Sequence, residues 1–312
     1  MTSPITGMAF VRMSVPDLDR MQSFLKDFGL EIVHRDERRL YSRGVGPAPY
    51  LHVAELGPPG VSALAYEAES EAVLQRFVDS GDAPAIEPLD GPGGGSRVRL
   101  QAPGGIRVEI VWREAVQPRS TRPVVRGPEG DSRSHGAARI VRLAHCAYMT
   151  TTLPETLAWF QDKLGVIPTD ELYVGSPENV IGQFDRLDRG DELVDHHVVF
   201  VLRGPRNGMH HASFQVEAVD DIFFGGDHLH GREHDHVRGI GRHALGSQIF
   251  DYWMSPFEQM HEHWISGERM NARSAFNRIQ IGEGMSHDSG EKPPERFVKQ
   301  ASAVVPALAD GA

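Results

Sequence analysis

The sequence predicts an α+β protein built from two similar halves, and three observations support this prediction. Apolar and polar residues alternate with a period of two in many short segments, which is typical of strands. Two amphipathic stretches end at Gly29 and Gly165, which is typical of helices. Residues 8–32 also align with residues 144–168, each in the order strand, polar loop, helix and strand. We therefore expect one architecture to occur twice.

The expected elements continue in the same order along both halves. The strand GVSALAYEA (60–68) aligns with GMHHASFQV (208–216), and APGGIRVEIVW (102–112) aligns with SPFEQMHEHWI (255–265). In the last pair of segments, the proline and the glutamate have the same spacing in both halves. Each half then holds two units of about 50–60 residues, each with a strand, a helix and about three further strands. The sequence thus predicts two domains of paired βαβββ modules.

Composition along the chain predicts where these domains meet. A stretch rich in proline, glycine and arginine, residues 117–137, is typical of a linker. It separates an N-terminal domain, 1–116, from a C-terminal domain, 138–266, and a polar tail, 267–312, is expected to lie on the surface or fray. At about 150 residues per domain, a chain of 312 residues agrees with two domains.

Overall composition excludes several classes of protein. Hydrophobic residues make up 40% and charged residues 24% of the chain, as in ordinary soluble proteins. No apolar run approaches the about 20 residues that span a bilayer, and the N-terminus does not resemble a secretory signal. The net charge of -11 disfavours binding to nucleic acid, and a single cysteine cannot form an internal disulfide. We expect a cytoplasmic homo-oligomer that binds neither nucleic acid nor membranes.

Histidines are concentrated in the second half of the chain, where twelve of the 16 lie between positions 145 and 263. In the alignment of the halves, two alanines stand opposite histidines and one glutamate is shared: Ala9 and His145, Ala63 and His211, Glu109 and Glu262. Imidazoles needed only for packing should show no such bias. We therefore interpret the N-terminal half as a vestigial copy. Two imidazoles and one carboxylate on one face of a metal suit non-haem Fe(II).

Four segments of the C-terminal half form a recognisable pattern: LAHCAY (143–148), DHHVVF (195–200), GMHHASF (208–214) and VRGIGRHALGSQIFDYWMSPFEQMHEHW (237–264). In the last segment His243, Tyr252 and Glu262 are nine and ten residues apart. The pattern resembles the type I extradiol ring-cleavage dioxygenases of the vicinal oxygen chelate superfamily, which are similar to catechol 2,3-dioxygenase. The resemblance implies the glyoxalase/bleomycin-resistance/extradiol dioxygenase fold, in which paired modules form half-open barrels.

The resemblance also assigns roles to individual residues. The metal ligands of the family fall on His145, His211 and Glu262. The acid-base histidine falls on His197, and residues on the substrate side fall on His243 and Tyr252. In some relatives, an arginine at the position of Arg238 pairs with a carboxylate of the substrate. The implied cofactor is Fe(II), with Mn(II) as the alternative, and O2 is the implied co-substrate.

Several neighbouring residues are expected to lie away from this site. Side chains alternate along a strand, so His196 and His210 should face away from the site, and so should His261 and His263. Cys146 should face the core. A further group of histidines is expected to be exposed in a loop: His228, His230, His234 and His236.

The function implied by the resemblance is extradiol cleavage of a catecholic substrate in aromatic degradation, with a 2-hydroxymuconic-semialdehyde-type product. Two departures from the family pattern concern the substrate. Glu258 stands where the family usually has glycine, and Ala147 stands where some relatives have asparagine. Two alternatives remain open at this point. One is a metal-dependent glyoxalase-like isomerase or epimerase, and the other is a non-catalytic small-molecule-binding protein on the same scaffold.

Overall fold

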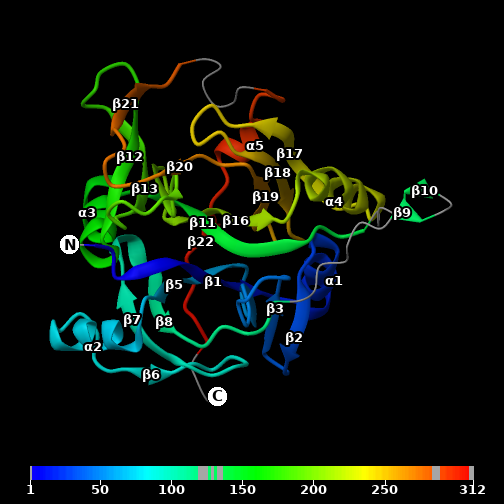
Figure 1. Ribbon diagram of the computed structural model, residues 1–312, viewed down its shortest axis with the longest axis horizontal. Helices are drawn as coiled ribbons and strands as arrows, with labels where there is room; N and C mark the ends of the chain where they lie inside the picture. The colour runs from blue at the N-terminus through cyan, green and yellow to red at the C-terminus, as the bar shows by residue number, and fades with distance from the viewer. Residues whose placement is uncertain (1, 119–125, 128–129, 132–135, 283–288, 309–312) are drawn as a thin grey trace.

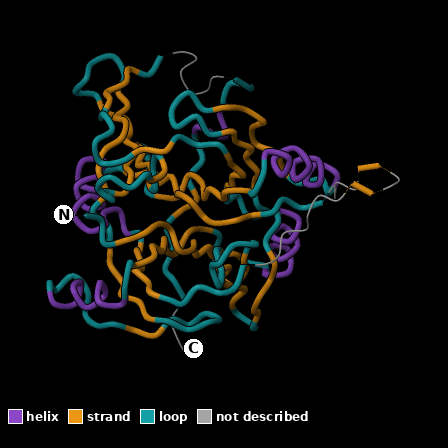
Figure 2. Tube along the Cα trace, in the orientation of Figure 1, coloured by secondary structure: helices purple, strands orange, loops and turns teal. Residues whose placement is uncertain are grey.

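The computed structural model describes residues 2–118, 126–127, 130–131, 136–282 and 289–308. Strands form a mixed sheet in each half, and the longer helices lie at the periphery (Figures 1 and 2). The predicted α+β class is thereby confirmed. Among the described residues, no helix is long and apolar enough to cross a membrane.

The first sheet is formed by eight strands of the N-terminal half. In spatial order they are β2 (Glu31–Arg35), β3 (Arg39–Arg43), β4 (His52–Leu56), β1 (Ile5–Val15), β5 (Gly60–Ala68), β8 (Arg107–Trp112), β7 (Ser96–Gln101) and β6 (Glu87–Pro88). This half also contains α1 (Leu18–Phe28), α2 (Glu71–Asp79) and a short 3₁₀ helix, Pro103–Gly105.

The second sheet is formed by the C-terminal half. In spatial order its strands are β17 (Asp235–Arg242), β18 (Ile249–Met254), β19 (Met260–Ile265), β16 (Gly208–Val216), β11 (Ile140–Thr150), β15 (Val199–Arg203), β13 (Val180–Leu187), β12 (Val166–Tyr173) and β21 (Asn277–Gln280), while β22 (Ser302–Ala303) pairs with β16. Its helices are α3 (Leu153–Leu164), α4 (Val219–Gly231) and α5 (Glu295–Val298).

Two small ladders complete the described strands. One joins β14 (Val194–Asp195) to β20 (Arg269–Met270), and the other joins β9 (Arg126–Gly127) to β10 (Gly130–Asp131). Most of the expected linker, 117–137, lies outside the described residues. The expected tail, 267–312, supplies β21, which pairs with β12, and also α5 and β22. It therefore adds strands to the second sheet.

Helix α1 shows why the sequence folds locally as it does. The Asp17 carboxylate accepts the backbone N–H groups of Asp19 and Arg20, which begins the helix. The apolar side chains recur every three or four residues and are buried: Leu18, Met21, Phe24, Leu25 and Phe28. Gly29 ends the helix with a φ of 109°, and Gly165 ends α3 with a φ of 61°. Both predicted helix ends are confirmed.

The ladders confirm most of the expected repeat and correct one pair. Strands β1, β5 and β8 pair as β11, β16 and β19 do, antiparallel and then parallel. Glu109 and Glu262 hold equivalent places in the two ladders. Phe10, not Ala9, is the equivalent of His145, because it lies opposite Ala65 as His145 lies opposite Ser213. The alignment was off by one because α3 has 12 residues and α1 has 11.

Candidate metal centre

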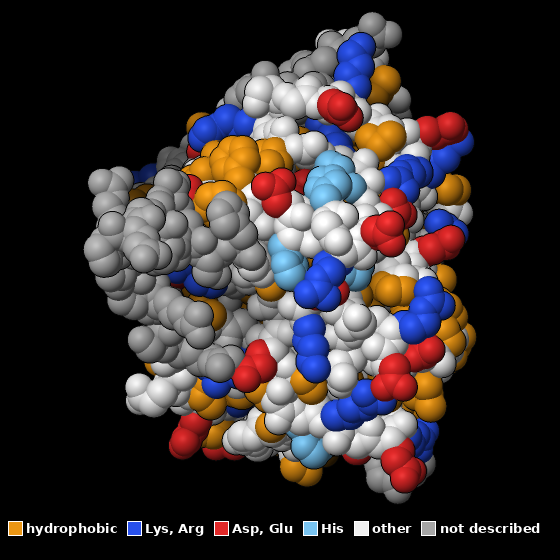
Figure 3. Space-filling model, turned by 90° about the vertical axis from the view of Figure 1, so that its right-hand side faces the viewer, with side chains coloured by type: hydrophobic (Ala, Val, Ile, Leu, Met, Phe, Trp, Pro, Cys, Tyr) orange, Lys and Arg blue, Asp and Glu red, His pale blue; other side chains and the backbone are white. Residues whose placement is uncertain are grey.

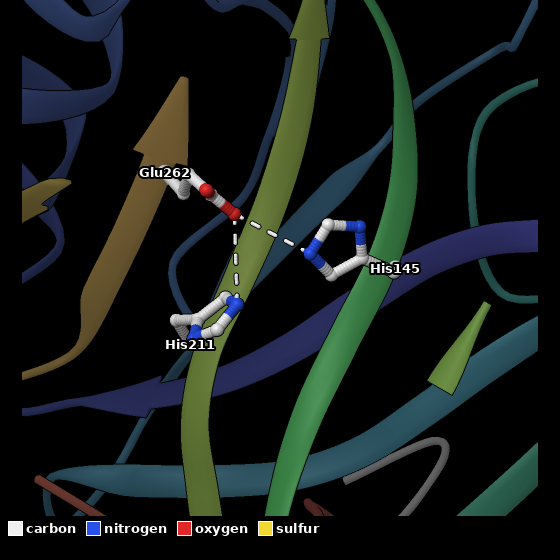
Figure 4. Close-up of side chains that lie close together, drawn as sticks. All are labelled: His145, His211 and Glu262. Atoms are coloured by element: carbon white, nitrogen blue, oxygen red, sulfur yellow. Dashed lines mark ion pairs between the residues drawn. The ribbon is translucent and has the colours of Figure 1, made fainter. Parts of the chain in front are cut away.

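Three neighbouring strands place two imidazoles and a carboxylate together. His145 lies on β11, His211 on β16 and Glu262 on β19, and all three side chains are buried. The Nε2 atoms of His145 and His211 lie 3.3 and 3.5 Å from the same oxygen of Glu262, Oε2. Figure 4 shows the three side chains pointing toward one another from separate strands. One ligand atom from each residue lies within 4.8 Å of the others.

The charges of this cluster suit a divalent cation. Burial alone would raise the pKa of Glu262, but the imidazoles of His145 and His243 hold it well below its ordinary value. Burial lowers the pKa of His211, so this imidazole is neutral near pH 7. Within the described residues, neither carboxylate oxygen of Glu262 has a hydrogen-bond partner. Two imidazoles and one buried carboxylate whose pKa is held low fit a divalent metal such as Fe(II) or Mn(II).

His210 does not face away from the site, as alternation along a strand predicted. Its Nδ1 lies 2.7 Å from Nδ1 of His211, and its Nε2 lies 2.9 Å from the carbonyl oxygen of Phe297. The β11–β16 register shifts between the pairs Ala147–His211 and Tyr148–Met209, so His210 sits in a bulge. A bulge interrupts the alternation of side chains. His210 therefore links the tail to a candidate ligand and orients the His211 ring.

His197 lies beside the metal cluster. Its ring centroid is 4.1 Å from that of His145, and only 4% of the residue is exposed. Burial, followed by the charges of His145 and His196, lowers its pKa well below the ordinary value. A neutral imidazole in this place can accept a proton.

His196, which was expected to point away, instead contacts His197. The two Nδ1 atoms are 3.1 Å apart, and Nε2 of His196 lies 2.9 Å from Oδ2 of Asp170. The expectation was wrong because residues 196–198 connect β14 to β15 and are not part of a strand. The sequence analysis missed Asp170. The only signal was the pairing of histidines in DHHVVF, which does not name a distant partner.

Tyr252 and His243 lie on the other side of Glu262. Tyr252 is directly opposite Glu262 in the β18–β19 ladder. Its hydroxyl lies 2.9 Å from Nε2 of His243, and the same nitrogen lies 3.6 Å from Oε1 of Glu262. Burial and the charge of Glu262 raise the pKa of Tyr252 well above its ordinary value, so the hydroxyl keeps its proton.

Arg238 completes the set of residues that the sequence singled out. It pairs with Tyr252 in the β17–β18 ladder and is 2% exposed. Its guanidinium carbon lies 4.5 Å from the ring centre of Phe250 and 5.1 Å from that of Phe297. Nε donates to the carbonyl oxygen of Glu291, but Nη2 has no hydrogen-bond partner among the described residues. A buried, unsatisfied cationic donor favours a ligand that supplies an acceptor.

A cavity of about 530 Å³ is lined by His145, His197, His211, Tyr252 and their neighbours His210, His243 and Arg238, but not by Glu262, His196 or Asp170. Its polar lining includes Arg238, Gln248 and Lys292. The apolar part of its lining comes from the sheet and from the tail: Leu172, Ile181, Phe184, Phe200, Leu202, Leu245, Ile281, Pro293, Phe297 and Val298. This volume and lining are typical of a site for a small, largely apolar molecule.

The histidines beside Glu262 point away from the metal cluster, as predicted. His263 stacks on Phe28, with ring centroids 3.9 Å apart, and its Nε2 donates to the Phe28 carbonyl oxygen. His261 packs against the rings of Phe24 and His52. Both contacts cross from β19 to the N-terminal half, which therefore supports the strand that carries Glu262. Cys146 is buried as predicted, and burial raises the pKa of its thiol.

The expected exposed loop of histidines is not found: His228 and His230 lie on α4, His234 lies in the connection that follows, and His236 lies on β17. His228 and His234 approach one carboxylate, Asp27 of α1, at 3.4 and 2.9 Å. Nε2 of His236 lies 2.8 Å from Asp251. Of the group, His230 is exposed as expected and the others are half-buried. The face that carries α1 and α4 shows histidines among acidic and basic side chains (Figure 3). Of the four, His228 and His234 link the C-terminal half to α1, whereas His230 and His236 have hydrogen-bond partners within their own half.

Comparisons with known proteins agree with this geometry. Residues 142–258 match the model of the Glyoxalase/Bleomycin resistance protein/Dioxygenase superfamily. The chain is 26% identical to metapyrocatechase 2 of Cupriavidus necator, covering 93% of this chain and 91% of that protein. It is 24% identical to a manganese-dependent 2,3-dihydroxybiphenyl 1,2-dioxygenase of Geobacillus genomosp. 3, covering 82% and 83% of the two chains.

Two solved structures share the fold. Homoprotocatechuate 2,3-dioxygenase from Brevibacterium fuscum superposes with a TM-score of 0.82 at 18% identity, covering 97% of this chain and 84% of the other. The Mn(II)-bound glyoxalase from Novosphingobium aromaticivorans superposes with a TM-score of 0.78 at 21% identity, covering 99% and 97%. The family resemblance and the fold expected from the sequence are confirmed. Residues 142–258 therefore form a domain that matches the Glyoxalase/Bleomycin resistance protein/Dioxygenase superfamily.

Proposed function

We propose that this chain is an extradiol dioxygenase that opens the ring of a catecholic substrate with O2. The observation that carries the proposal is the buried cluster of His145, His211 and Glu262 at the end of an apolar cavity, with His197 in contact with it. The named relatives and a fold neighbour support it, because they are metapyrocatechases and other ring-cleaving dioxygenases.

His145, His211 and Glu262 would hold the metal, Fe(II) or Mn(II). When bound, that ion supplies a Lewis acid that lowers the pKa of a substrate hydroxyl and places substrate and O2 together. Manganese is represented among the named proteins, since one relative is manganese-dependent and one fold neighbour is Mn(II)-bound.

The chain's own residues would perform the acid-base steps. His197, neutral because it is buried, accepts a proton from a catechol hydroxyl and later returns it to the product. Tyr252, whose hydroxyl keeps its proton, donates a hydrogen bond to a substrate oxygen. His243, which contacts that hydroxyl, orients it. The apolar walls exclude water from the ring.

Arg238 would select the ring substituent. Arg238 lines the cavity, and a carboxylate or another acceptor on the substrate would give its Nη2 the hydrogen-bond partner that it lacks among the described residues. The product would be a semialdehyde of the 2-hydroxymuconic type. We also retain the expectation of a cytoplasmic homo-oligomer. Light scattering would measure its mass.

We further propose that the two halves have different roles, as expected from the repeat. Residues 138–266 form the catalytic domain, and residues 1–116 form a domain without a metal site. The tail, 267–312, contributes Phe297 to the cavity and to the hydrogen bond with His210, so it belongs to the site as well.

A direct test is anaerobic loading with Fe(II) or Mn(II), followed by a panel of catechols in air. Oxygen uptake with a yellow product supports extradiol cleavage, and a dicarboxylic acid product contradicts it. The Mn(II)-bound glyoxalase with the same fold favours one second candidate, a glyoxalase-like isomerase. Metal binding without oxygen uptake across the panel would favour that candidate. A protein that binds no metal would favour a sequestering role.

A further inference from the structure

A chain of hydrogen bonds extends from His197 away from the cavity. Nδ1 of His197 lies 3.1 Å from Nδ1 of His196, and Nε2 of His196 lies 2.9 Å from Oδ2 of Asp170. The three residues are between 1% and 4% exposed. His196 and Asp170 do not line the cavity, so they do not contact a substrate there.

The direction of these hydrogen bonds follows from the carboxylate. Burial disfavours the charge of Asp170, but hydrogen bonds from His196 and Asn277 hold its pKa below the ordinary value. An ionised carboxylate only accepts, so Nε2 of His196 must carry a hydrogen. When His196 carries this one hydrogen, its other nitrogen, Nδ1, is the acceptor of the pair. The Nδ1–H of His197 donates to this nitrogen of His196, so the lone pair of the His197 ring is on Nε2.

The surroundings hold this chain in one geometry. Nδ2 of Asn277, on β21, donates to the second oxygen of Asp170 at 2.9 Å. Thr169 Oγ1 donates to the carbonyl oxygen of His196, and the N–H of His196 donates to that of Glu268. At Gly246, whose φ is 78°, a Cβ atom would come within 3.2 Å of the His196 ring. The backbone thus packs directly against this imidazole.

We infer that Asp170 and His196 are positioning residues that fix the tautomer and orientation of His197, so that its Nε2 presents a lone pair to the cavity. The inference rests on the proposed role of His197 as the acid-base group. Neither residue touches the substrate or the metal cluster. The arrangement follows the general rule that the partner of one ring nitrogen decides what the other can do.

Asp170→Asn tests the inference because it preserves shape and reverses the hydrogen bond. Nδ2 of Asn277 donates a hydrogen bond, so the amide oxygen of the new asparagine should face Asn277. The new amide nitrogen then faces Nε2 of His196 and donates to it. His196 then donates from Nδ1, and His197 carries its hydrogen on Nε2. We expect turnover of a catechol to fall about 10²–10³-fold, with metal content unchanged.

The second readout does not depend on activity. In ¹⁵N-histidine-labelled, metal-free protein, the His197 signals are those that disappear in His197→Gln. We expect the imidazole hydrogen on Nδ1 in the unchanged chain and on Nε2 in Asp170→Asn. The same tautomer in both proteins, or undiminished turnover, would overturn the inference. If no catechol reacts even with the unchanged chain, the proposed function fails, and the NMR comparison still decides the inference.

Asp185→Asn is the matched control. Asp185 is another buried carboxylate of the same sheet, and neither His196 nor His197 bonds to it. We expect normal turnover and unchanged His197 signals in this variant. Should Asp170→Asn not fold, His196→Phe keeps a ring of similar size without nitrogen. It should leave His197 as a mixture of tautomers and lower turnover, and a single Nδ1–H tautomer there would contradict the inference.

Discussion

The two halves bury a glutamate at the same place in their sheets and neutralise it in different ways. Glu109 pairs with Ala65 as Glu262 pairs with Ser213, and both glutamates are fully buried. In the C-terminal half, the neighbouring strands supply the imidazoles of His145 and His211. In the N-terminal half, the equivalent positions hold Phe10 and Ala63, which offer no metal ligand.

In the N-terminal half, the positive charge beside the buried glutamate comes from an arginine. Arg12 lies opposite Ala63, and its Nε lies 3.1 Å from Oε1 of Glu109. The same guanidinium also reaches Glu55 at 3.2 Å and Asp90 at 2.8 Å. Burial alone would lower the pKa of Arg12, but these carboxylates raise it well above the ordinary value. This cation is permanent.

The difference shows what a scaffold needs to acquire or lose a metal site. A buried carboxylate is costly unless a cation pairs with it. The guanidinium of an arginine side chain supplies this cation, and it leaves no coordination position for a substrate. In the C-terminal half, the ligand atoms of His145, His211 and Glu262 lie close enough together to share an exchangeable ion. Arg12 therefore explains how the N-terminal half keeps its glutamate without a metal.

The largest expected effect comes from Glu262→Gln. The amide keeps the shape but removes the charge that pairs with the cation, so we expect metal binding and turnover to be abolished. The loss of metal affinity should exceed the about 10–100-fold that changes beyond the ligands cause. Metal content after dialysis measures it. Glu109→Gln is the matched control and should keep its full complement of metal; loss of metal there would break the comparison.

His197→Gln should have the next largest effect. The amide cannot act as the proposed base for the hydroxyl proton, so turnover should fall about 10²–10⁴-fold. Iron content should be normal, because His197 contacts the cluster without belonging to it. Steady-state oxygen uptake per bound iron makes the measurement. A protein that lost iron but kept its activity per iron would show that His197 is a ligand.

The sequence predicted the repeat because strand alternation and helix ends at glycine depend on local pattern. It indicated the candidate ligands His145, His211 and Glu262 only through the histidine bias between the halves and the resemblance to extradiol dioxygenases. It misplaced His196 and His210, since one lies outside a strand and the other in a bulge, where alternation no longer holds. No sequence spacing indicated Phe297, because that contact depends on how the tail folds back.

The counterpart of Glu262 gives the third prediction. Glu109→Gln leaves Arg12 buried with one carboxylate fewer, while metal binding is untouched. Removing one partner of a buried pair costs about 3–5 kcal/mol of unfolding free energy. Urea unfolding of the metal-free proteins would measure this cost. We expect Glu262→Gln to be destabilised less in that state, because no permanent cation loses its partner. Equal destabilisation would contradict the roles assigned to the two glutamates.

A third buried carboxylate shows what happens when no cation is supplied. Asp185, on β13, accepts a hydrogen bond from Gln183 at 2.7 Å, and its Oδ2 has no hydrogen-bond partner among the described residues. Burial raises its pKa from 3.8 to about 7. Glu262 is equally buried, yet its neighbours hold its pKa low. The partners of these carboxylates, and not their depth, therefore decide their charge.

Asp185→Asn should have the smallest effect, and its sign depends on pH. The unfolded chain releases the Asp185 proton near pH 4 and the folded chain near pH 7, so between these values the folded state binds more protons and stability falls as pH rises. The amide cannot ionise, so the variant should gain stability over the unchanged chain as pH rises from 4 to 8, by at most about 4 kcal/mol. Below pH 4 the two proteins should differ little, because the acid is protonated in both states. Thermal unfolding of the metal-free proteins at several pH values would measure the difference. A difference that did not change with pH would show that Asp185 ionises normally, and that this carboxylate has a cationic partner after all.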